Sequence, residues 1–231
     1  MFFKKLLKGG SNRVSNFLIF IRNQASANFR RFIKDQHQLT STTGSDRYPE
    51  LFSEAKVAVT ALKKPYSILS FGCSTGEECF TMKSYFPESK IIGVDINKGN
   101  LRKAASRSPS SDIQFLFSSP KAIAANGRYD LIFCLSVLCR WEDTKDLTNC
   151  ENVYSFKKFT ETVGFLAGQL LTGGLLIIYN SNFRFEDTPF FQAFEIVNTP
   201  SVSNSGFVHK FDSQNNRTLE NHRHCIYRKI G

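Results

Sequence analysis

The stretch that most constrains the fold runs from Ser67 to Gly76 and reads SILSFGCSTG. Its first half is apolar, and it then breaks into a run of small residues. A buried strand that ends in a small-residue turn and leads into a helix forms a nucleotide-binding corner in doubly wound α/β sheets. Glycine suits such a turn because it adopts positive φ and lets the backbone approach a ligand. The stretch therefore predicts a nucleotide-type cofactor at this corner.

The chain around this corner alternates between predicted strands and helices. Strands are expected at 67–71, 90–94, 113–117, 129–134 and 175–179, and helices at 49–63, 77–85, 97–107 and 153–171. The last helix should end at Gly173-Gly174, since glycine commonly ends helices. Segments 207–211 and 225–228 predict an antiparallel hairpin at one sheet edge. We expect a Rossmann-like α/β fold, with a doubly wound and mostly parallel sheet of about seven strands and additional N-terminal helices.

The N-terminal part of the chain differs from the rest in charge. The formal net charge of the chain is +10, and residues 1–34 hold eight Lys and Arg but no Asp or Glu. Residues 36–46 are polar and rich in Ser and Thr, as loops are. We therefore divide the chain into a basic helical extension with a linker at 1–46 and an α/β domain at 47–231. The extension could pack on the domain, cover the site as a lid, or contact an anionic membrane surface.

The six cysteines lack any CxxC pair. Several lie in apolar runs, which indicates reduced thiols and a cytoplasmic protein rather than a disulfide scaffold. Neither the cysteines nor the pair His222 and His224 has the pattern of a metal site, so no metal is expected. No apolar stretch reaches the ~18–20 residues of a membrane span.

Further polar residues fall where a nucleotide would need them. Asp95 ends the second predicted strand, where a carboxylate can accept both ribose hydroxyls. Ser118 follows the third strand, beside the expected adenine, and Leu135 and Ser136 lead away from the fourth strand toward the ligand-binding edge. An NAD or FAD enzyme is an alternative for such a fold, but GCSTG departs from the pattern GxGxxG.

Four segments carry a family resemblance: SILSFGCSTGEE, IIGVDINKGNL, YDLIFCLSVL and LLTGGLLII. Over residues 65–180 they resemble the class I S-adenosylmethionine-dependent methyltransferases, and their motifs look most like the chemoreceptor glutamate methyltransferases of bacteria. The resemblance implies S-adenosyl-L-methionine as cofactor, with the 72–76 turn and Ser136 near its methionine part, Asp95 on its ribose and Ile96 beside its adenine. The cofactor-binding residues predicted in this way are Gly72, Cys73, Ser74, Thr75, Gly76, Asp95, Ile96, Ser118, Leu135 and Ser136.

The acceptor side departs from the chemoreceptor type. That type usually has Pro-Tyr-Ser where this chain has residues 79–81, Arg-Asn at 135–136 and Gly-His-Ser-Glu at 179–182. The receptor substrate is therefore not carried over.

Candidate acceptor-binding residues follow the fourth and fifth strands: Arg140, Trp141, Asn180, Asn182 and Arg184. Candidate catalytic residues are Tyr179, Asn180, His37 and His209, although a general base is needed only for some nucleophiles. The leading hypothesis is a small-molecule methyltransferase, because the core is minimal and the segment after the fifth strand is rich in phenylalanine. A methyltransferase acting on an acidic protein or a nucleic acid such as RNA, suggested by the basic N-terminus, and a non-catalytic cofactor-binding or scaffold protein are the alternatives.

Overall fold

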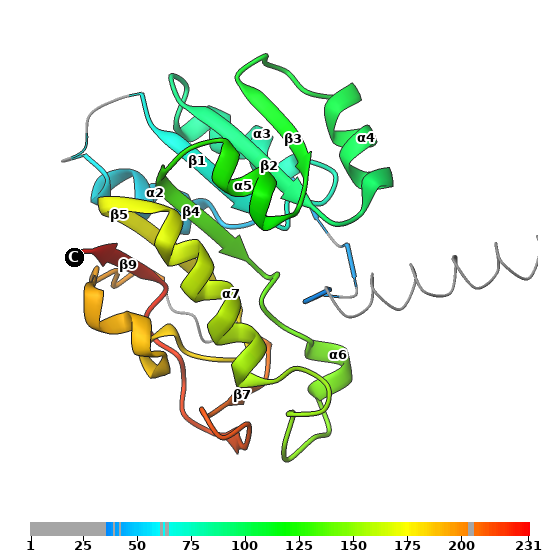
Figure 1. Cartoon of the computed structure of the whole chain (residues 1–231), viewed down its shortest axis with the longest axis vertical. Coiled ribbons are helices and arrows are strands. Elements are labelled where there is room, and N and C mark those ends of the chain that lie inside the picture. Colours follow the sequence, from blue (N-terminus) through cyan, green and yellow to red (C-terminus); the bar gives the residue numbers. More distant parts are fainter. Residues whose placement is uncertain (1–35, 39, 42, 61, 63–64, 203–205) are drawn as a thin grey trace, which may run out of the picture. The chain divides into compact units, whose positions relative to one another are not determined.

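A seven-stranded sheet forms the centre of the unit that spans residues 37–231 in this computed structural model (Figure 1). The structure describes residues 36–38, 40–41, 43–60, 62, 65–202 and 206–231. The predicted basic helices fall on residues 1–34, outside this range, so their existence and role stay predictions.

The strand order of the sheet is β3-β2-β1-β4-β5-β9-β6. The first five strands pair in parallel, and β9 runs antiparallel to both β5 and β6. The strands of the sheet are β1 Ser67–Phe71, β2 Lys90–Asp95, β3 Ile113–Phe117, β4 Tyr129–Leu135, β5 Leu170–Tyr179, β6 Phe194–Ile196 and β9 Ile226–Lys229. The predicted fold class, a mostly parallel seven-stranded sheet with an antiparallel C-terminal pair, is confirmed.

The residues of the antiparallel pair differ from the prediction. The edge partner of β9 is β6, which has only three residues and was not expected. The segment predicted as the other hairpin strand instead forms β7, Lys210–Phe211, which pairs with β8, Arg217–Thr218, in a separate two-stranded sheet. So short a strand as β6 has no readable alternation of polar and apolar residues.

Three of the helices start at residues whose side chains stabilise the helix N-terminus. Side-chain oxygens of Asn97, Ser119 and Ser155 accept backbone N–H groups at the starts of these three, as N-caps do. Two of the helices, α5 and α6, are too short to show helical periodicity and were not predicted. The helices are α2 Pro49–Ala58, α3 Glu77–Tyr85, α4 Lys98–Ser106, α5 Pro120–Ala125, α6 Trp141–Thr144 and α7 Phe156–Gln169, with 3-10 turns η1 Phe185–Asp187 and η2 Pro189–Ala193.

The helices cover both faces of the sheet. Alternate residues of a strand point to opposite faces, and Ile68 and Leu69 of β1 accordingly belong to two different apolar clusters. One cluster contains Ile123 of α5 and Phe159 of α7, and the other contains residues of α2, α3 and α4. Figure 1 shows this layering, with α7 and α5 on one face of the sheet.

Helix α7 and strand β5 meet earlier in the chain than predicted. The helix ends at Gln169, and Gly173-Gly174 lies inside β5 rather than at a helix end. Gly173 has φ 82°, and the pairing of β4 with β5 shifts register at this point. The two glycines therefore form an irregularity in a strand, which is the other common use of glycine besides ending a helix.

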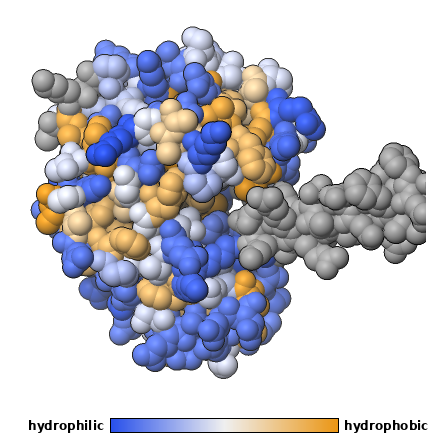
Figure 2. Space-filling view, in the orientation of Figure 1, coloured by the Kyte–Doolittle hydropathy of each residue, from blue (hydrophilic) through white to orange (hydrophobic). Residues whose placement is uncertain are grey.

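The surface in Figure 2 is mixed, and hydrophilic side chains cover most of its lower part, around α6 and β7. Within the described residues, no helix is both long enough and apolar enough to span a bilayer.

Candidate active site

The turn after β1 combines a strained backbone with close packing. Gly72 has φ 84° and Ser74 has φ 50°. The amides of Gly72 and Cys73 both donate to the carbonyl oxygen of Val94, at 2.8 and 3.0 Å, and so tie the turn to β2. A Cβ atom on Gly72 would lie 2.4 Å from Cγ2 of Val137. Both the backbone conformation and the available space therefore require glycine at position 72.

Asp95, the last residue of β2, holds the turn from the other side. One of its carboxylate oxygens accepts the amide of Ser74 at 2.9 Å, and the other accepts the amide of Asn97 at 2.7 Å. Burial raises the pKa of Asp95 above its ordinary value, although these backbone hydrogen bonds act against the shift. The structure thus brings Asp95 next to the turn, as the spacing in the sequence predicted.

The ends of β4 and β5 carry two more residues with positive φ. Ser136 follows β4 with φ 54°, and Asn180 follows β5 with φ 58°. The Asn180 side-chain amide donates to Ser136 Oγ at 3.0 Å, and the Tyr48 hydroxyl lies 2.7 Å from the same oxygen. The ring of Tyr48 also packs on that of Tyr179, with centroids 4.8 Å apart. Side chains from three separate parts of the chain therefore converge at one point of the carboxyl edge.

The two acids that open α3 have different environments. Burial alone would raise the pKa of Glu77, but hydrogen bonds from Thr75 and Arg107 lower it below its ordinary value. Burial raises the pKa of Glu78 to about 8, against the effects of a hydrogen bond from Ser70 Oγ at 2.8 Å and the charge of Arg47. Glu78 is thus a carboxyl group whose local surroundings favour its neutral form, at the base of the turn.

The segment of residues 37–48 crosses this edge of the sheet. Gln38 donates to Cys139 Sγ at 3.5 Å, in the loop after β4. Further along, the backbone carbonyl of Ser41 accepts a hydrogen bond from the Ser74 hydroxyl at 3.3 Å. The Ser41 hydroxyl accepts a hydrogen bond from the side-chain amide of Asn100 at 3.1 Å. Residues predicted as a linker therefore contact the turn that is predicted to bind the cofactor.

His37, a predicted candidate base, lies at the start of this segment. Its Nδ1 is 2.9 Å from the Tyr154 hydroxyl, and its Nε2 is 3.3 Å from Thr162 Oγ1. Burial lowers the pKa of His37 to about 3, and the charges of Lys158 and Arg140 act in the same direction. The imidazole is neutral at physiological pH, and both its nitrogens are engaged by neighbouring side chains.

The acceptor candidates after the fourth and fifth strands have separate surroundings. Asn182 is fully buried and links two loops, because it accepts the amide of Arg140 at 2.7 Å and donates to the carbonyl of His209 at 2.7 Å. Trp141 begins α6 and packs edge-on against Phe207, with centroids 5.2 Å apart. Asn182 therefore stabilises the packing of the two loops. Asn180 instead belongs, with Tyr48 and Ser136, to the group of side chains called the convergent cluster below.

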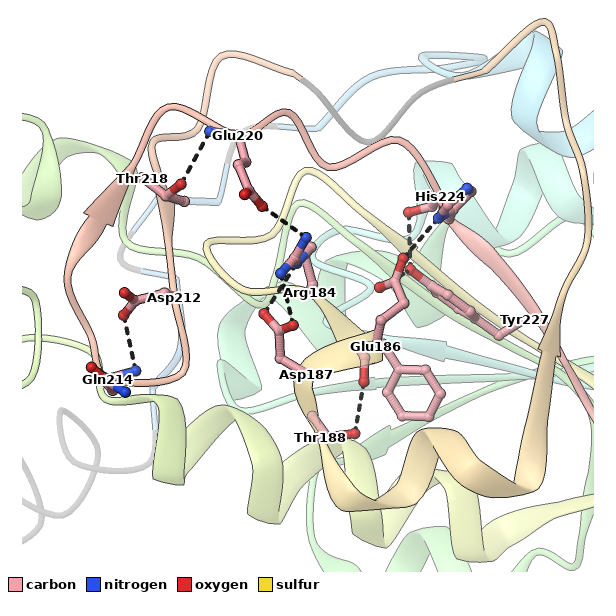
Figure 3. A network of polar contacts seen from close by, with 11 residues as sticks. Arg184, Glu186, Asp187, Thr188, Asp212, Gln214, Thr218, Glu220, His224 and Tyr227 are labelled. Atoms are coloured by element: carbon pink, nitrogen blue, oxygen red, sulfur yellow. Dashed lines mark hydrogen bonds and ion pairs between the residues drawn. The ribbon is translucent and has the colours of Figure 1, made fainter.

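Arg184 belongs to a polar network beyond the end of β5. Its guanidinium donates to both carboxylate oxygens of Asp187, at 3.1 and 2.9 Å, and to Glu220 at 3.0 Å (Figure 3). A cavity of about 510 Å³ lies beside it and is lined also by Glu186 and His224. The charge of Arg184 is thus matched by two carboxylates. In the described part of the chain, including this network, no cluster of three or more His, Cys, Asp or Glu could hold a metal ion.

The phenylalanines after β5 are mostly core residues. Phe183, Phe185 and Phe194 are buried and belong to one apolar cluster, while Phe190 is 39% exposed. The abundance of phenylalanine in this segment therefore reflects mainly core packing and does not by itself support a small-molecule acceptor.

His209, another candidate base, is bound by Arg217 at 2.8 Å.

All predicted cofactor residues lie at the carboxyl ends of neighbouring strands. Sequence reasoning missed Tyr48, and its only local signal was its position just before Pro49, which starts a helix. It also could not foresee that Lys210 is buried, because a lysine inside a predicted strand looks like a surface residue.

Comparisons with known proteins agree with this geometry. The family model described as "Methyltransferase domain" matches residues 69–154. No curated protein matches the chain. The structure of TehB from Haemophilus influenzae is similar in fold, with a TM-score of 0.50 and 15% identity, over 80% of this chain and 63% of that chain.

Two further structures show weaker likeness. One is CalS10, an amino pentose methyltransferase from Micromonospora echinaspora, with a TM-score of 0.43 and 19% identity over 58% of this chain and 51% of that chain. The other is the plantazolicin methyltransferase BpumL, with a TM-score of 0.41 and 18% identity over 56% of this chain and 46% of that chain. The chain thus spans about half the length of each of these two proteins.

Proposed function

We propose that this methyltransferase domain, whose methyl donor is S-adenosylmethionine, transfers the methyl group to a small-molecule acceptor. The observation that carries the proposal is the convergence of Ser74, Ser136 and Asn180 at one edge of the sheet. Each is a non-glycine residue with positive φ: Ser136 and Asn180 directly follow β4 and β5, and Ser74 lies in the turn after β1. Such conformations cost about 1 kcal/mol or more each and concentrate at functional sites. Ligands of open α/β sheets bind at this same edge.

The cofactor would lie across the ends of β1, β2 and β4. The Asp95 carboxylate would accept the ribose hydroxyls, and it already stands beside the turn through its bond with Ser74. The closely packed 72–76 turn would admit the methionine part, and Ile96 and Ser118 would flank the adenine. The resemblance to chemoreceptor methyltransferases supports this donor half only.

Glu78 would compensate the positive charge of the donor. When bound, S-adenosylmethionine supplies a methyl group already activated on a sulfonium. A partly buried carboxyl group with a raised pKa favours a cationic neighbour, because the neighbour stabilises its charged form. Glu78 would in this way help to orient the donor rather than take part in bond making.

The acceptor would bind against Tyr48, Ser136 and Asn180. Burial raises the pKa of Tyr48, so its hydroxyl remains a hydrogen-bond donor at neutral pH rather than a base. The 37–48 segment crosses the edge on one side, and Gly206 lies so near Asn180 that a Cβ atom there would be 2.6 Å from its Oδ1. An edge crossed by two chain segments suits a small acceptor, held in line with the methyl group and shielded from water.

Two measurements test this proposal. Calorimetry should show binding of S-adenosylmethionine and of its demethylated product to the full chain, with weaker binding for Asp95→Ala. A cell extract incubated with the protein and methyl-labelled donor is then separated by ultrafiltration. Label in the small-molecule filtrate supports the proposal.

The other outcomes identify the alternatives. Label retained with protein or RNA would indicate a macromolecular acceptor, which the basic residues 1–34 could attract in a salt-dependent way. Cofactor binding without label in either fraction would indicate a non-catalytic cofactor-binding protein. Absence of cofactor binding would refute the proposal altogether.

A further inference from the structure

Lys210 is a buried lysine with an unusually sparse set of partners. It is 6% exposed, and its ammonium donates one hydrogen bond, to the carbonyl oxygen of Ser181 at 2.8 Å. Among the described residues, no carboxylate forms an ion pair with it. The described part of the chain therefore offers a hydrogen-bond acceptor to one of the three N–H donors of the ammonium.

Such a group is unfavourable unless a ligand completes its surroundings. Removing an ammonium from water costs free energy that a single carbonyl does not return. Burial accordingly lowers the pKa of Lys210 to about 8. The side chain still carries its positive charge for most of the time at neutral pH.

The position of Lys210 links it to the acceptor side of the site. Ser181 directly follows Asn180 at the end of β5, and Cys139 lies in the loop after β4, where Gln38 of the 37–48 segment reaches it. Burial raises the pKa of Cys139 to about 12, while the positive charges of Lys210 and Arg140 act in the opposite direction. The positive charges of Lys210 and Arg140 therefore both act on Cys139, in the loop that begins at Ser136 of the convergent cluster.

We propose that Lys210 binds an anionic group of the methyl acceptor, a carboxylate or a phosphate, and so selects acidic small molecules. This inference rests on the proposed function and adds the substrate class. An anion at this point would accept hydrogen bonds from the remaining N–H donors of Lys210. It would also compensate a charge that no carboxylate in the described residues pairs with. Arg140, which is 8% exposed and 3.4 Å from Asp143, would contribute to the same positive field.

A purely structural role for Lys210 is the alternative, and the chain offers a matched control. Lys229 in β9 also donates to backbone carbonyls, those of Ala167 and Leu170, at 3.0 and 3.1 Å. It lies at the end of α7, away from the carboxyl edge. If Lys210 only satisfied a carbonyl, Lys210→Met and Lys229→Met should behave alike.

The test uses fluorine NMR on the full chain, with and without the demethylated cofactor. The probes are 4-fluorobenzoate, 4-fluorophenyl phosphate and the neutral 4-fluorobenzamide. Wild-type protein should bind at least one anion more tightly than the amide. Lys210→Met should weaken anion binding by about tenfold to a hundredfold and leave the amide unchanged. Lys210→Arg should restore most of the preference, and Lys229→Met should match the wild type.

The result also shows which anion is recognised and how it relates to the proposed function. Preference for the phosphate or for the carboxylate identifies the group. Equal binding of anions and amide by the wild type, or unchanged anion binding in Lys210→Met, would overturn the inference. Anion binding is measured separately from cofactor binding, so loss of one leaves the result for the other intact. Circular dichroism of each variant excludes unfolding as the cause.

Discussion

The hydroxyl groups of Tyr48 and Ser136 lie 2.7 Å apart, although 88 positions separate them in the sequence. Ser136 at the same time accepts the amide of Asn180. The contact joins the residue before α2 to the end of β4, and it fixes one side of the proposed acceptor position. Its removal should therefore affect turnover more than folding.

Tyr48→Phe removes the hydroxyl and keeps the ring that packs on Tyr179. We expect the free energy of unfolding to fall by about 1 kcal/mol, the usual value of one hydrogen bond. Methyl transfer should slow by about tenfold because the acceptor is held less well, with affinity for the demethylated cofactor nearly unchanged. Tyr85→Phe is the control, since its hydroxyl donates to the exposed Asp46 at 3.2 Å and is not part of the contact with Ser136. Equal rates for the two variants would contradict a role for Tyr48.

Gly72→Ala should be among the most destabilising single substitutions in the turn. The added Cβ atom would lie 2.4 Å from Cγ2 of Val137. The backbone at this position also has φ 84°, which residues other than glycine rarely adopt. We expect a loss of about 2–4 kcal/mol in urea unfolding, together with weaker cofactor binding.

Gly127→Ala separates the two causes. Gly127 has φ 98°, but a Cβ atom there meets nothing within 4 Å. It should lose only about 1 kcal/mol, from the backbone conformation alone. If both alanine variants lose the same amount, the contact with Val137 is not what requires glycine at position 72.

Glu78 should make stability and cofactor binding depend on pH. Its folded-state pKa of about 8 lies above the ordinary value of 4.5, so the folded state holds the proton more tightly than the unfolded state. The resulting stabilisation is complete below 4.5 and is lost as the pH rises through 8. The free energy of unfolding of the wild type should therefore fall relative to Glu78→Gln across this window.

Cofactor binding should release a proton from the same carboxyl group. The cationic donor favours the charged form of Glu78, so wild-type protein should release up to about one proton per cofactor at neutral pH. Calorimetry in buffers of different ionisation enthalpy measures this number, and Glu78→Gln should release none. If the wild type and Glu78→Gln release the same number of protons, the charge of the bound donor does not act on Glu78.

The network in Figure 3 should matter for stability rather than catalysis. Glu186 accepts the buried Tyr227 hydroxyl at 2.8 Å and His224 Nδ1 at 2.9 Å. Glu186→Gln should lower the free energy of unfolding by about 1–3 kcal/mol, because both bonds lose their charge assistance. Glu195→Gln is the comparison, because it removes an ion pair between Arg228 and a Glu195 side chain that is 56% exposed. It should change the free energy of unfolding by less than about 1 kcal/mol. Thermal unfolding of the two variants decides the comparison.

The central strands could be predicted because each is a short apolar run bounded by turn residues. β1 and β3 have the predicted ends, and Asp95 lies beside Ser74 as its spacing implied. Gly173 was misread because glycine serves both helix ends and strand irregularities, and only pairing with β4 decides between them. The surroundings of Tyr48 and Lys210 depend on contacts with residues far away in sequence, at positions 136 and 181, which local patterns do not encode.

All six cysteines are buried and unpaired. Burial raises the pKa values of thiols such as Cys134 and Cys139, so few of them are thiolates at neutral pH and maleimide dyes reach them slowly. A cysteine substituted for Leu219, which is 96% exposed after β8, would then react first. A single cysteine introduced at an exposed position should therefore be labelled selectively with a fluorescent dye, without replacing any of the six native cysteines.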